Sequence, residues 1–275
     1  MRKSILLFLS SILAFGFMAV AQKSKSTEPV PLSKAEADKF KGIKWRNIGP
    51  FRGGRANAIA GIPQDDNVYY VGYTGGGIAK TDDAGITWKN ISDGFFKVGS
   101  IGEIAICETD PNVIYVGTGE HAVRGVMTSF GDGVYKSTDG GKTWKNSGLE
   151  KTRHISEIAV HPTNSEVVLV GAQGPLHGTS ADRGVYKSID GGVTWKKTLY
   201  VDENTGVSAL NMDMTNPRII YAATWQHRRY PWKVESGGTG CAIWKSTDAG
   251  ETWNKIVEGL PKEMGKIGVS VSRAN

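Results

Sequence analysis

The stretch GVYKSTDGGKTW, Gly133 to Trp144, decides the fold because its pattern returns along the chain. The pattern Ser/Thr-x-Asp-x-Gly-x-Thr-Trp occurs four times, at residues 81–88, 137–144, 188–195 and 246–253. The four tryptophans follow one another at intervals of 56, 51 and 58 residues. An interval of this size, filled with short alternating runs and Gly-rich turns, is what one four-stranded blade of a β-propeller needs.

The spacing inside the pattern has a physical reason. The Ser/Thr hydroxyl and the Asp carboxylate can accept hydrogen bonds from N–H groups of a tight turn, and the Gly supplies a positive φ. The Trp then buries a broad apolar face between neighbouring sheets. A calcium loop of the EF-hand type would need a longer run of ligands ending in Glu. We therefore assign structural roles to Asp83, Trp88, Asp139, Trp144, Asp190, Trp195, Asp248 and Trp253.

These four stretches resemble the Asp-box, or bacterial neuraminidase repeat, which is found in sialidases, xyloglucan-hydrolysing propellers, sortilin-type receptors and photosystem II assembly factors. The runs WRNIGPFRGGR (residues 45–55), GTGE (117–120) and YAATWQHRRYPW (221–232) extend the resemblance to large exported bacterial proteins described as sortilin-like or glycosyl-hydrolase-like. The resemblance covers residues 43–275. It implies a propeller strongly and an activity hardly at all.

The N-terminus has the features of an export signal. Arg2 and Lys3 precede an apolar run, and Ala19-Val20-Ala21 is a small-x-small cleavage site before Gln22. We expect a signal peptide over residues 1–21 that is cleaved after Ala21, a flexible leader over 22–42 and a propeller over 43–275. The apolar run is short for a membrane anchor. The sequence therefore predicts an exported protein, periplasmic, cell-surface or secreted, with no membrane attachment after cleavage.

Composition excludes some function classes. The net charge of +6 falls to +4 without Arg2 and Lys3, which is too small and too evenly spread for a nucleic-acid-binding protein. Cys107 and Cys241 lie in different repeats and are expected to be packed thiols. The histidines lack ligand spacing, so no metal site and no cofactor are expected.

Each repeat is expected to open with an innermost first strand, at residues 56–61, 101–107, 155–161, 207–212 and 267–272. Second strands are expected at 68–73, 113–117, 167–172 and 219–224. The run Lys44–Pro50 looks like an outer strand without a blade of its own. The predicted fold class is all-β, a β-propeller with about four blades of four antiparallel strands plus one strand. Further C-terminal blades are therefore expected.

Strand polarity predicts where a ligand would bind. Loops that join the second and third strands share one face with those that lead into the next blade, while the Asp boxes lie on the opposite face. The second-to-third-strand loops combine acids, imidazoles, guanidinium groups and aromatic rings. The candidate ligand-binding residues on this face are Glu120, His121, Arg124, Asp132, His177, Arg183, His227, Arg229 and Trp232.

Glu103 and Glu157 hold matching places in consecutive first strands, where a carboxylate is either paired or lines a wet channel. Ala209 takes the third equivalent position, which breaks the series.

The family resemblance leaves the activity open. Glycoside hydrolysis usually needs two carboxylates, and xyloglucan-hydrolysing propellers carry one in a Thr-Asp-x-Gly-Gly run where this chain has Gly75. Phe51-Arg52 keeps only half of the sialidase Phe-Arg-Ile-Pro run. Our first hypothesis is a binding module for a protein or glycan ligand. The alternative is a sialidase-like or xyloglucanase-like glycoside hydrolase that uses Glu120 or Asp132, and a third class is a structural assembly factor.

Overall fold

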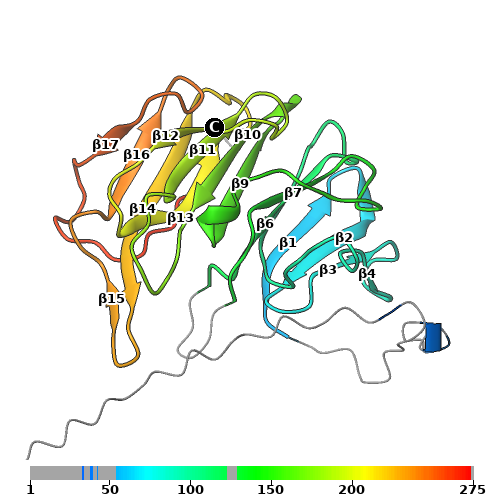
Figure 1. The fold of residues 1–275 in the computed structure, drawn as a ribbon. Helices are drawn as coiled ribbons and strands as arrows, with labels where there is room; N and C mark the ends of the chain where they lie inside the picture. Colours follow the sequence, from blue (N-terminus) through cyan, green and yellow to red (C-terminus); the bar gives the residue numbers. More distant parts are fainter. Residues whose placement is uncertain (1–32, 34–37, 40–41, 43–53, 123–128, 274–275) are drawn as a thin grey trace, which may run out of the picture. The chain divides into compact units, whose positions relative to one another are not determined.

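The protein is described by a computed structural model for residues 33, 38–39, 42, 54–122 and 129–273 (Figure 1). The chain divides into two compact units, Met1–Pro50 and Phe51–Asn275, and the strands found among the described residues belong to the second. The predicted signal peptide and the outer strand at Lys44–Pro50 lie outside the described residues. Within those residues, no helix has the length and apolar character needed to cross a membrane.

Four sheets follow one another along the second unit, each with antiparallel strands paired in chain order. Blade 1 contains β1 (Ala56–Ile62), β2 (Asp65–Tyr73), β3 (Ile78–Thr81) and β4 (Lys89–Asn90). Blade 2 contains β5 (Ile101–Ile106), β6 (Ile114–Thr118), β7 (Val134–Ser137) and β8 (Lys145–Asn146). Blade 3 follows the 3-10 turn η1 (Glu150–Thr152) with β9 (Ile155–His161), β10 (Asn164–Ala172), β11 (Gly184–Ser188) and β12 (Lys196–Leu199). Blade 4 contains β13 (Thr205–Met212), β14 (Ile220–Arg229), β16 (Ala242–Ser246) and β17 (Asn254–Ile256), with the short β15 (Val234–Ser236) paired to β14.

The blades touch through their first strands, β1 against β5, β5 against β9 and β9 against β13. A side chain near the start of the first strand bonds to the next blade at two joints: Asn57 Nδ2 to the Ile101 carbonyl (3.0 Å) and Ser156 Oγ to the Val207 carbonyl (2.8 Å). In blade 4, Ser208 Oγ makes the same kind of bond to the Ile267 carbonyl (2.8 Å), which follows the blade. Gly102 takes the remaining equivalent place, because a Cβ there would lie 2.2 Å from the Ile155 carbonyl oxygen. The first strands therefore form the inner wall of a partial β-propeller, as predicted.

The expected fifth first strand, residues 267–272, lies beside β13 but is not a strand. Its Ile267 carbonyl accepts the Ser208 bond of the repeated joint, and its Val271 N–H donates to Asn211 Oδ1 at 3.0 Å. A strand needs a ladder of backbone hydrogen bonds. No described strand pairs with this segment, so its position follows the repeat while its backbone stays irregular.

The four tryptophan hairpins, residues 81–88, 137–144, 188–195 and 246–253, share one set of hydrogen bonds. In the second, the Gly141 N–H donates to Ser137 Oγ (2.9 Å), and the Thr143 N–H and hydroxyl donate to the two Asp139 oxygens (2.9 and 2.6 Å). The other three hairpins repeat these bonds. Gly141 has φ 85°, a conformation that favours glycine. The Thr143 bonds lower the pKa of Asp139 to about 2.

Three of the four indoles join neighbouring blades. Their Nε1 atoms donate to the outer strand region of the preceding blade: Trp144 to the Ile91 carbonyl (3.0 Å), Trp195 to the Ser147 carbonyl (2.7 Å) and Trp253 to Thr198 Oγ1 (3.2 Å). Trp88, in the first blade, donates to the Gly85 carbonyl of its own hairpin at 3.1 Å.

The hydrophobic core consists of three clusters, each between two neighbouring blades. Tyr70 and Tyr115 are fully buried there, and their hydroxyls donate to carbonyls of the next blade, those of Gly140 and Ser165. Burial of such side chains contributes roughly 25 cal/mol per Å² of apolar surface. Cys107 and Cys241 are both free and buried in the structure.

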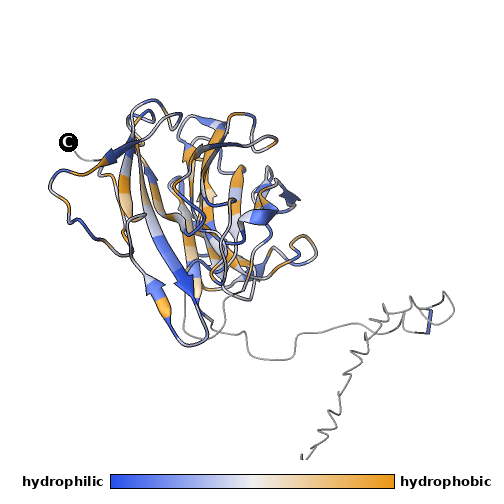
Figure 2. Cartoon of the chain, turned by 60° about the vertical axis from the view of Figure 1, so that its left-hand side comes forward, coloured by the Kyte–Doolittle hydropathy of each residue, from blue (hydrophilic) through white to orange (hydrophobic). Residues whose placement is uncertain are grey.

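Blade 4 differs from the other three at one end. β14 continues past its pairing with β16 and forms a hairpin with β15, in which Arg228 lies opposite Glu235 (Figure 1). The far end of β14, Gln226-His227-Arg228-Arg229, is hydrophilic, and Figure 2 shows a blue strand end at this hairpin. The hairpin therefore adds a polar surface to the face of the second-to-third-strand loops.

Candidate functional site

The loops between second and third strands lie on the same rim as the loops that enter the next blade. Backbone hydrogen bonds join the two kinds of loop: Gly77 N to Gly99 O, Gly119 N to Ser100 O and Gln173 N to His154 O, each 2.9 Å. We call this rim the loop face, made of residues 74–77, 91–100, 119–122, 129–133, 147–154, 173–183, 200–204 and 230–241. The candidate Arg124 lies outside the described residues.

The two candidate acids of the second blade are both engaged. Glu120 is fully buried, and its Oε1 lies 2.6 Å from Nη1 of Arg55. Asp132 accepts a hydrogen bond from the Tyr135 hydroxyl at 2.7 Å, and its backbone N–H donates to Thr118 Oγ1. Both carboxylates therefore have protein partners, Glu120 in Arg55 and Asp132 in Tyr135 of β7.

Three imidazoles lie below the surface of the loop face. His154 is fully buried, with neither ring nitrogen hydrogen-bonded, and packs 5.5 Å from the Phe130 ring. Burial lowers the pKa of His154 to about 3, with further contributions from the charges of His227 and Arg183. Burial likewise lowers the pKa of His121 and of His227 to about 4. All three rings are therefore uncharged at neutral pH.

His227 belongs to a stacked pair. Its ring lies 4.3 Å from the Trp225 ring at an interplanar angle of 16°, and its Nε2 is 3.4 Å from Nε2 of Gln173. The Oε1 of Gln173 is buried without a hydrogen-bond partner. The contact between Gln173 and His227 connects the third and fourth blades beneath the loops.

Arg183 is a fully buried guanidinium that bonds only to backbone carbonyls among its described contacts. Nε donates to Glu203 at 2.8 Å, Nη1 to Gln173, and Nη2 to Pro175 and to Gly178. Burial lowers its pKa to about 10. The side chain therefore fixes the loop 173–183 against the start of β13.

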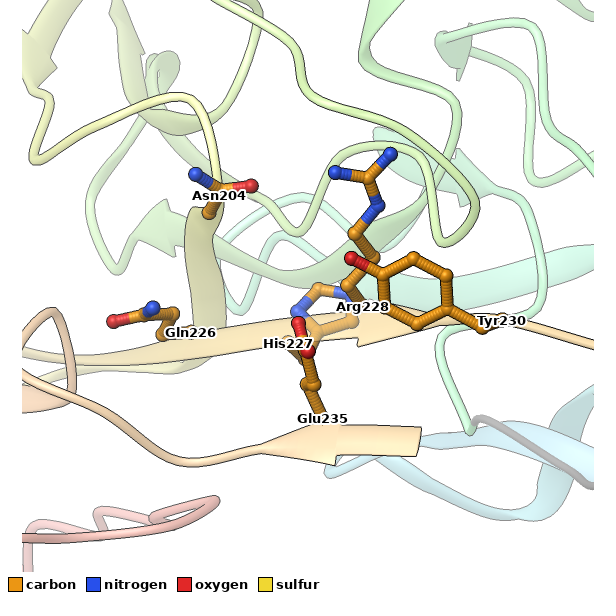
Figure 3. A pocket seen from close by; sticks show the side chains of 6 residues that line it. All are labelled: Asn204, Gln226, His227, Arg228, Tyr230 and Glu235. Carbon is orange, nitrogen blue, oxygen red and sulfur yellow. The ribbon is translucent and has the colours of Figure 1, made fainter. Parts of the chain in front are cut away.

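A pocket of about 250 Å³ opens beside the end of β14 (Figure 3). Its lining residues come from β14, from the hairpin with β15 and from the loop before β13: Asn204, Gln226, His227, Arg228, Tyr230 and Glu235. Figure 3 shows the Arg228 side chain rising from β14 between Asn204 on the left and Tyr230 on the right. The guanidinium carbon of Arg228 lies 4.9 Å from the Tyr230 ring centre.

An aromatic pair flanks this pocket. The Tyr230 and Trp232 rings are stacked with centres 5.8 Å apart, and Trp232 is 78% exposed. Such an exposed, paired aromatic surface offers a flat apolar face to a ligand. The two remaining candidates lie nearby, since the exposed His177 has Nδ1 3.3 Å from the Arg229 carbonyl oxygen.

The structure thus brings His227, Arg229, Trp232 and His177 together near the pocket, while Glu120, His121 and Asp132 lie in the second blade. Sequence reasoning missed Asn204, Gln226, Arg228, Tyr230 and Glu235. The signal for most of them was present in the run TWQHRRYPW, residues 224–232, whose density of aromatic and basic residues exceeds that of the other loops.

The sequence predicts no xyloglucanase-type acid at position 75 and no metal site. Gly75, at the place of the expected xyloglucanase acid, is an exposed residue of the short loop 74–77. Within residues 54–122 and 129–273, no three His, Cys, Asp or Glu side chains gather closely enough to hold a metal ion.

Comparisons with known proteins agree with this architecture. The family model described as "Sortilin, neurotensin receptor 3" matches residues 132–264. Xyloglucanase Xgh74A of Acetivibrio thermocellus is 27% identical over 279 residues, which cover 93% of this chain and 32% of the relative. A xyloglucanase of Paenibacillus sp is 24% identical, covering 77% of this chain and 22% of the relative. The chain therefore spans about a third or less of the length of these relatives.

Two solved structures have the same fold over much of the chain. The GH74 enzyme of Niastella koreensis matches 72% of this chain and 29% of its own, with a TM-score of 0.55 and 21% identity. The GH74 xyloglucanase of Xanthomonas campestris matches 73% of this chain and 29% of its own, with a TM-score of 0.52 and 17% identity. The chain is therefore a partial β-propeller with the fold of these GH74 structures.

Proposed function

We propose that this chain is part of an exported, glycoside-hydrolase-like propeller protein, and that its loop face binds a polysaccharide. The observation that supports this most is the pocket at the end of β14 with the Tyr230–Trp232 pair beside it. Sugar rings stack on aromatic faces, while their hydroxyls need donors and acceptors. The pocket supplies both kinds of group, from Asn204, Gln226 and Glu235.

The relatives named xyloglucanases favour a glycan over a protein ligand and favour hydrolysis over binding alone. These relatives narrow our first hypothesis, a binding module for a protein or glycan, to a glycan ligand. They also support the alternative, a glycoside hydrolase. Hydrolysis would need two carboxylates across the scissile bond, as in retaining and inverting hydrolases.

The contacts of the two second-blade carboxylates favour a role in holding the loop over a role in proton transfer. Glu120 is buried against Arg55, and Asp132 accepts a bond from Tyr135. Glu235 is a better placed acid, because it lines the pocket and keeps a half-exposed side chain, 48% accessible. The proposal therefore assigns Glu120 and Asp132 to loop structure and Glu235 to ligand contact.

Export and domain boundaries belong to the same proposal. We propose a signal peptide over residues 1–21, a leader over 22–42 and a partial propeller over 43–275. N-terminal sequencing of the exported protein tests this, and a chain that begins at Met1 would contradict it.

A binding and hydrolysis assay tests the function. Full-length protein is run through native gels that contain xyloglucan, and reducing ends are measured after incubation with the same polysaccharide. Retardation that is lost in Trp232→Ala supports the site, and release of reducing ends supports the hydrolase. A matched control is Trp88→Ala, whose indole lies in a hairpin of the opposite rim. Equal migration of the parent protein with and without xyloglucan and other glycans would contradict the proposal.

A further inference from the structure

The pocket contains a guanidinium group whose charge is not matched. Arg228 is half-buried, and its Nε is buried without a hydrogen-bond partner. No carboxylate of the described residues lies within 4.0 Å of its nitrogens. An unpaired buried donor is unfavourable, and a bound acceptor would satisfy it.

The nearest acid is already occupied by other partners. Glu235 lies opposite Arg228 in the β14–β15 ladder, but its Oε1 pairs with Nζ of Lys233 at 2.7 Å. The hydrogen bond from Lys233 is the main cause of its lowered pKa, and the charge of Arg228 and a bond from Tyr230 contribute less. Because Lys233 balances Glu235, the pocket keeps one positive charge from Arg228.

A second guanidinium adds to this positive field. Arg183 is fully buried and bonds to carbonyls, with no carboxylate in contact among the described residues. Burial is the main cause of its lowered pKa; the charge of Asp202 raises that pKa, and the charge of Arg228 lowers it. The charges of Arg183 and Arg228 repel each other. An anionic ligand would relieve this repulsion.

We infer that the pocket binds an acidic sugar, a uronic acid residue of a polysaccharide, with its carboxylate on the Arg228 guanidinium and its ring toward the Tyr230–Trp232 pair. This inference rests on the proposed function and names its substrate class. A guanidinium matches a carboxylate with two parallel hydrogen bonds, which a neutral hexose cannot offer. Asn204 and Gln226 line the side of the pocket where the sugar hydroxyls would lie.

Calorimetry with defined oligosaccharides tests the inference. Full-length protein is titrated with oligogalacturonate and with neutral xyloglucan oligosaccharides of similar length. We expect tighter binding of the acidic oligosaccharide and a weakening by added salt. Arg228→Gln should reduce that affinity roughly ten- to hundredfold, the loss of a charge-assisted hydrogen-bond pair. Arg228→Lys should lie between, because it keeps the charge and loses the planar fork.

The controls separate the possible failures. Arg218→Gln, on an exposed turn of the opposite rim, should bind as the parent does. Competition by acetate at equal concentration with oligogalacturonate would show a general carboxylate site, and would overturn the assignment to a sugar. Equal or tighter binding of the neutral oligosaccharide, or an unchanged affinity in Arg228→Gln, would overturn the acidic substrate class while leaving the proposed function intact. Binding of neither oligosaccharide would overturn both.

Discussion

At the scale of single residues, Arg183 holds its own loop in place through hydrogen bonds to backbone carbonyls. Its guanidinium donates to four carbonyls from the loop 173–183 and from Glu203, all beneath the loop face. A lysine ammonium at the same place cannot reach carbonyls that lie in several directions. We expect Arg183→Lys to lower the free energy of unfolding by about 2–4 kcal/mol in urea titrations. A loss below that range, with unchanged loop protection in hydrogen exchange, would contradict this role.

Glu103 makes a second residue-scale case. It lies in β5 at the position matched by Glu157 in β9, and Glu157 lines a cavity of about 300 Å³ along the first strands. Burial, and then the charge of Glu157, raise the pKa of Glu103 to about 8. Because the folded pKa exceeds the unfolded value of 4.5, this group favours the folded state at low pH, and that contribution is lost as pH rises toward 8.

We expect the stability of Glu103→Gln relative to that of the parent to increase from pH 6 to pH 9. The gain should be about 2–3 kcal/mol, because the neutral amide never has to ionise in a buried site. Denaturant titrations at the two pH values measure it. If the free energies of unfolding of parent and variant changed with pH in parallel, Glu103 would have the same pKa in the folded and unfolded states, and the prediction would be wrong.

At the scale of elements, the tryptophan hairpins connect blades in a fixed register. Trp144 is 6% exposed and bonds to Ile91 of the first blade, whereas Trp88 bonds within its own hairpin. We expect Trp144→Ala to cost about 3–5 kcal/mol of unfolding free energy, through lost burial and a lost hydrogen bond. Trp88→Ala is the matched variant and should cost less than about 2 kcal/mol. Equal losses in thermal unfolding would refute a joint between blades.

The repeated elements could be predicted from the sequence because their signals are local. Alternating apolar residues predict the first and second strands, and the hairpin pattern predicts its own turn. The end of β14 could not be predicted, since Gln226-His227-Arg228-Arg229 has no apolar alternation. Its strand conformation depends on pairing with β15, which lies across a loop. The segment 267–272 shows the opposite case, in which strand periodicity occurs without a described partner.

At the scale of the whole molecule, the candidate site was only partly predictable. The loop face follows from strand polarity, and the run 224–232 pointed to the fourth blade. Burial was not predictable, because His154 is covered by Phe130 from the loop of another blade and Arg183 by the carbonyls of its own loop and of Glu203. Sequence patterns report the neighbours along a strand and not the cover that distant loops provide. Residues such as Glu120 therefore resembled exposed ligand contacts while being buried.

The buried imidazoles make the acid stability of the molecule testable. His121, His154 and His227 have pKa values of about 4, 3 and 4, all lowered mainly by burial from 6.5. Between pH 6.5 and these values the unfolded chain binds protons that the folded chain excludes, so stability falls as pH falls. Glu103 has the opposite effect, since its contribution makes stability fall as pH rises. The pH of maximum stability should therefore lie between the range where the histidines destabilise the fold and the range where Glu103 does.

His154→Leu isolates the imidazole contribution. Neither ring nitrogen of His154 has a hydrogen-bond partner, so an apolar side chain of similar size loses no bond and removes an unsatisfied buried group. We expect the variant to be at least as stable as the parent at pH 8, and its advantage to grow by about 2–3 kcal/mol at pH 4.5. Urea unfolding at both pH values measures this difference. An advantage that does not change with pH would mean that His154 takes up its proton in the folded state as readily as in the unfolded chain, and that the loop face opens to water in acid.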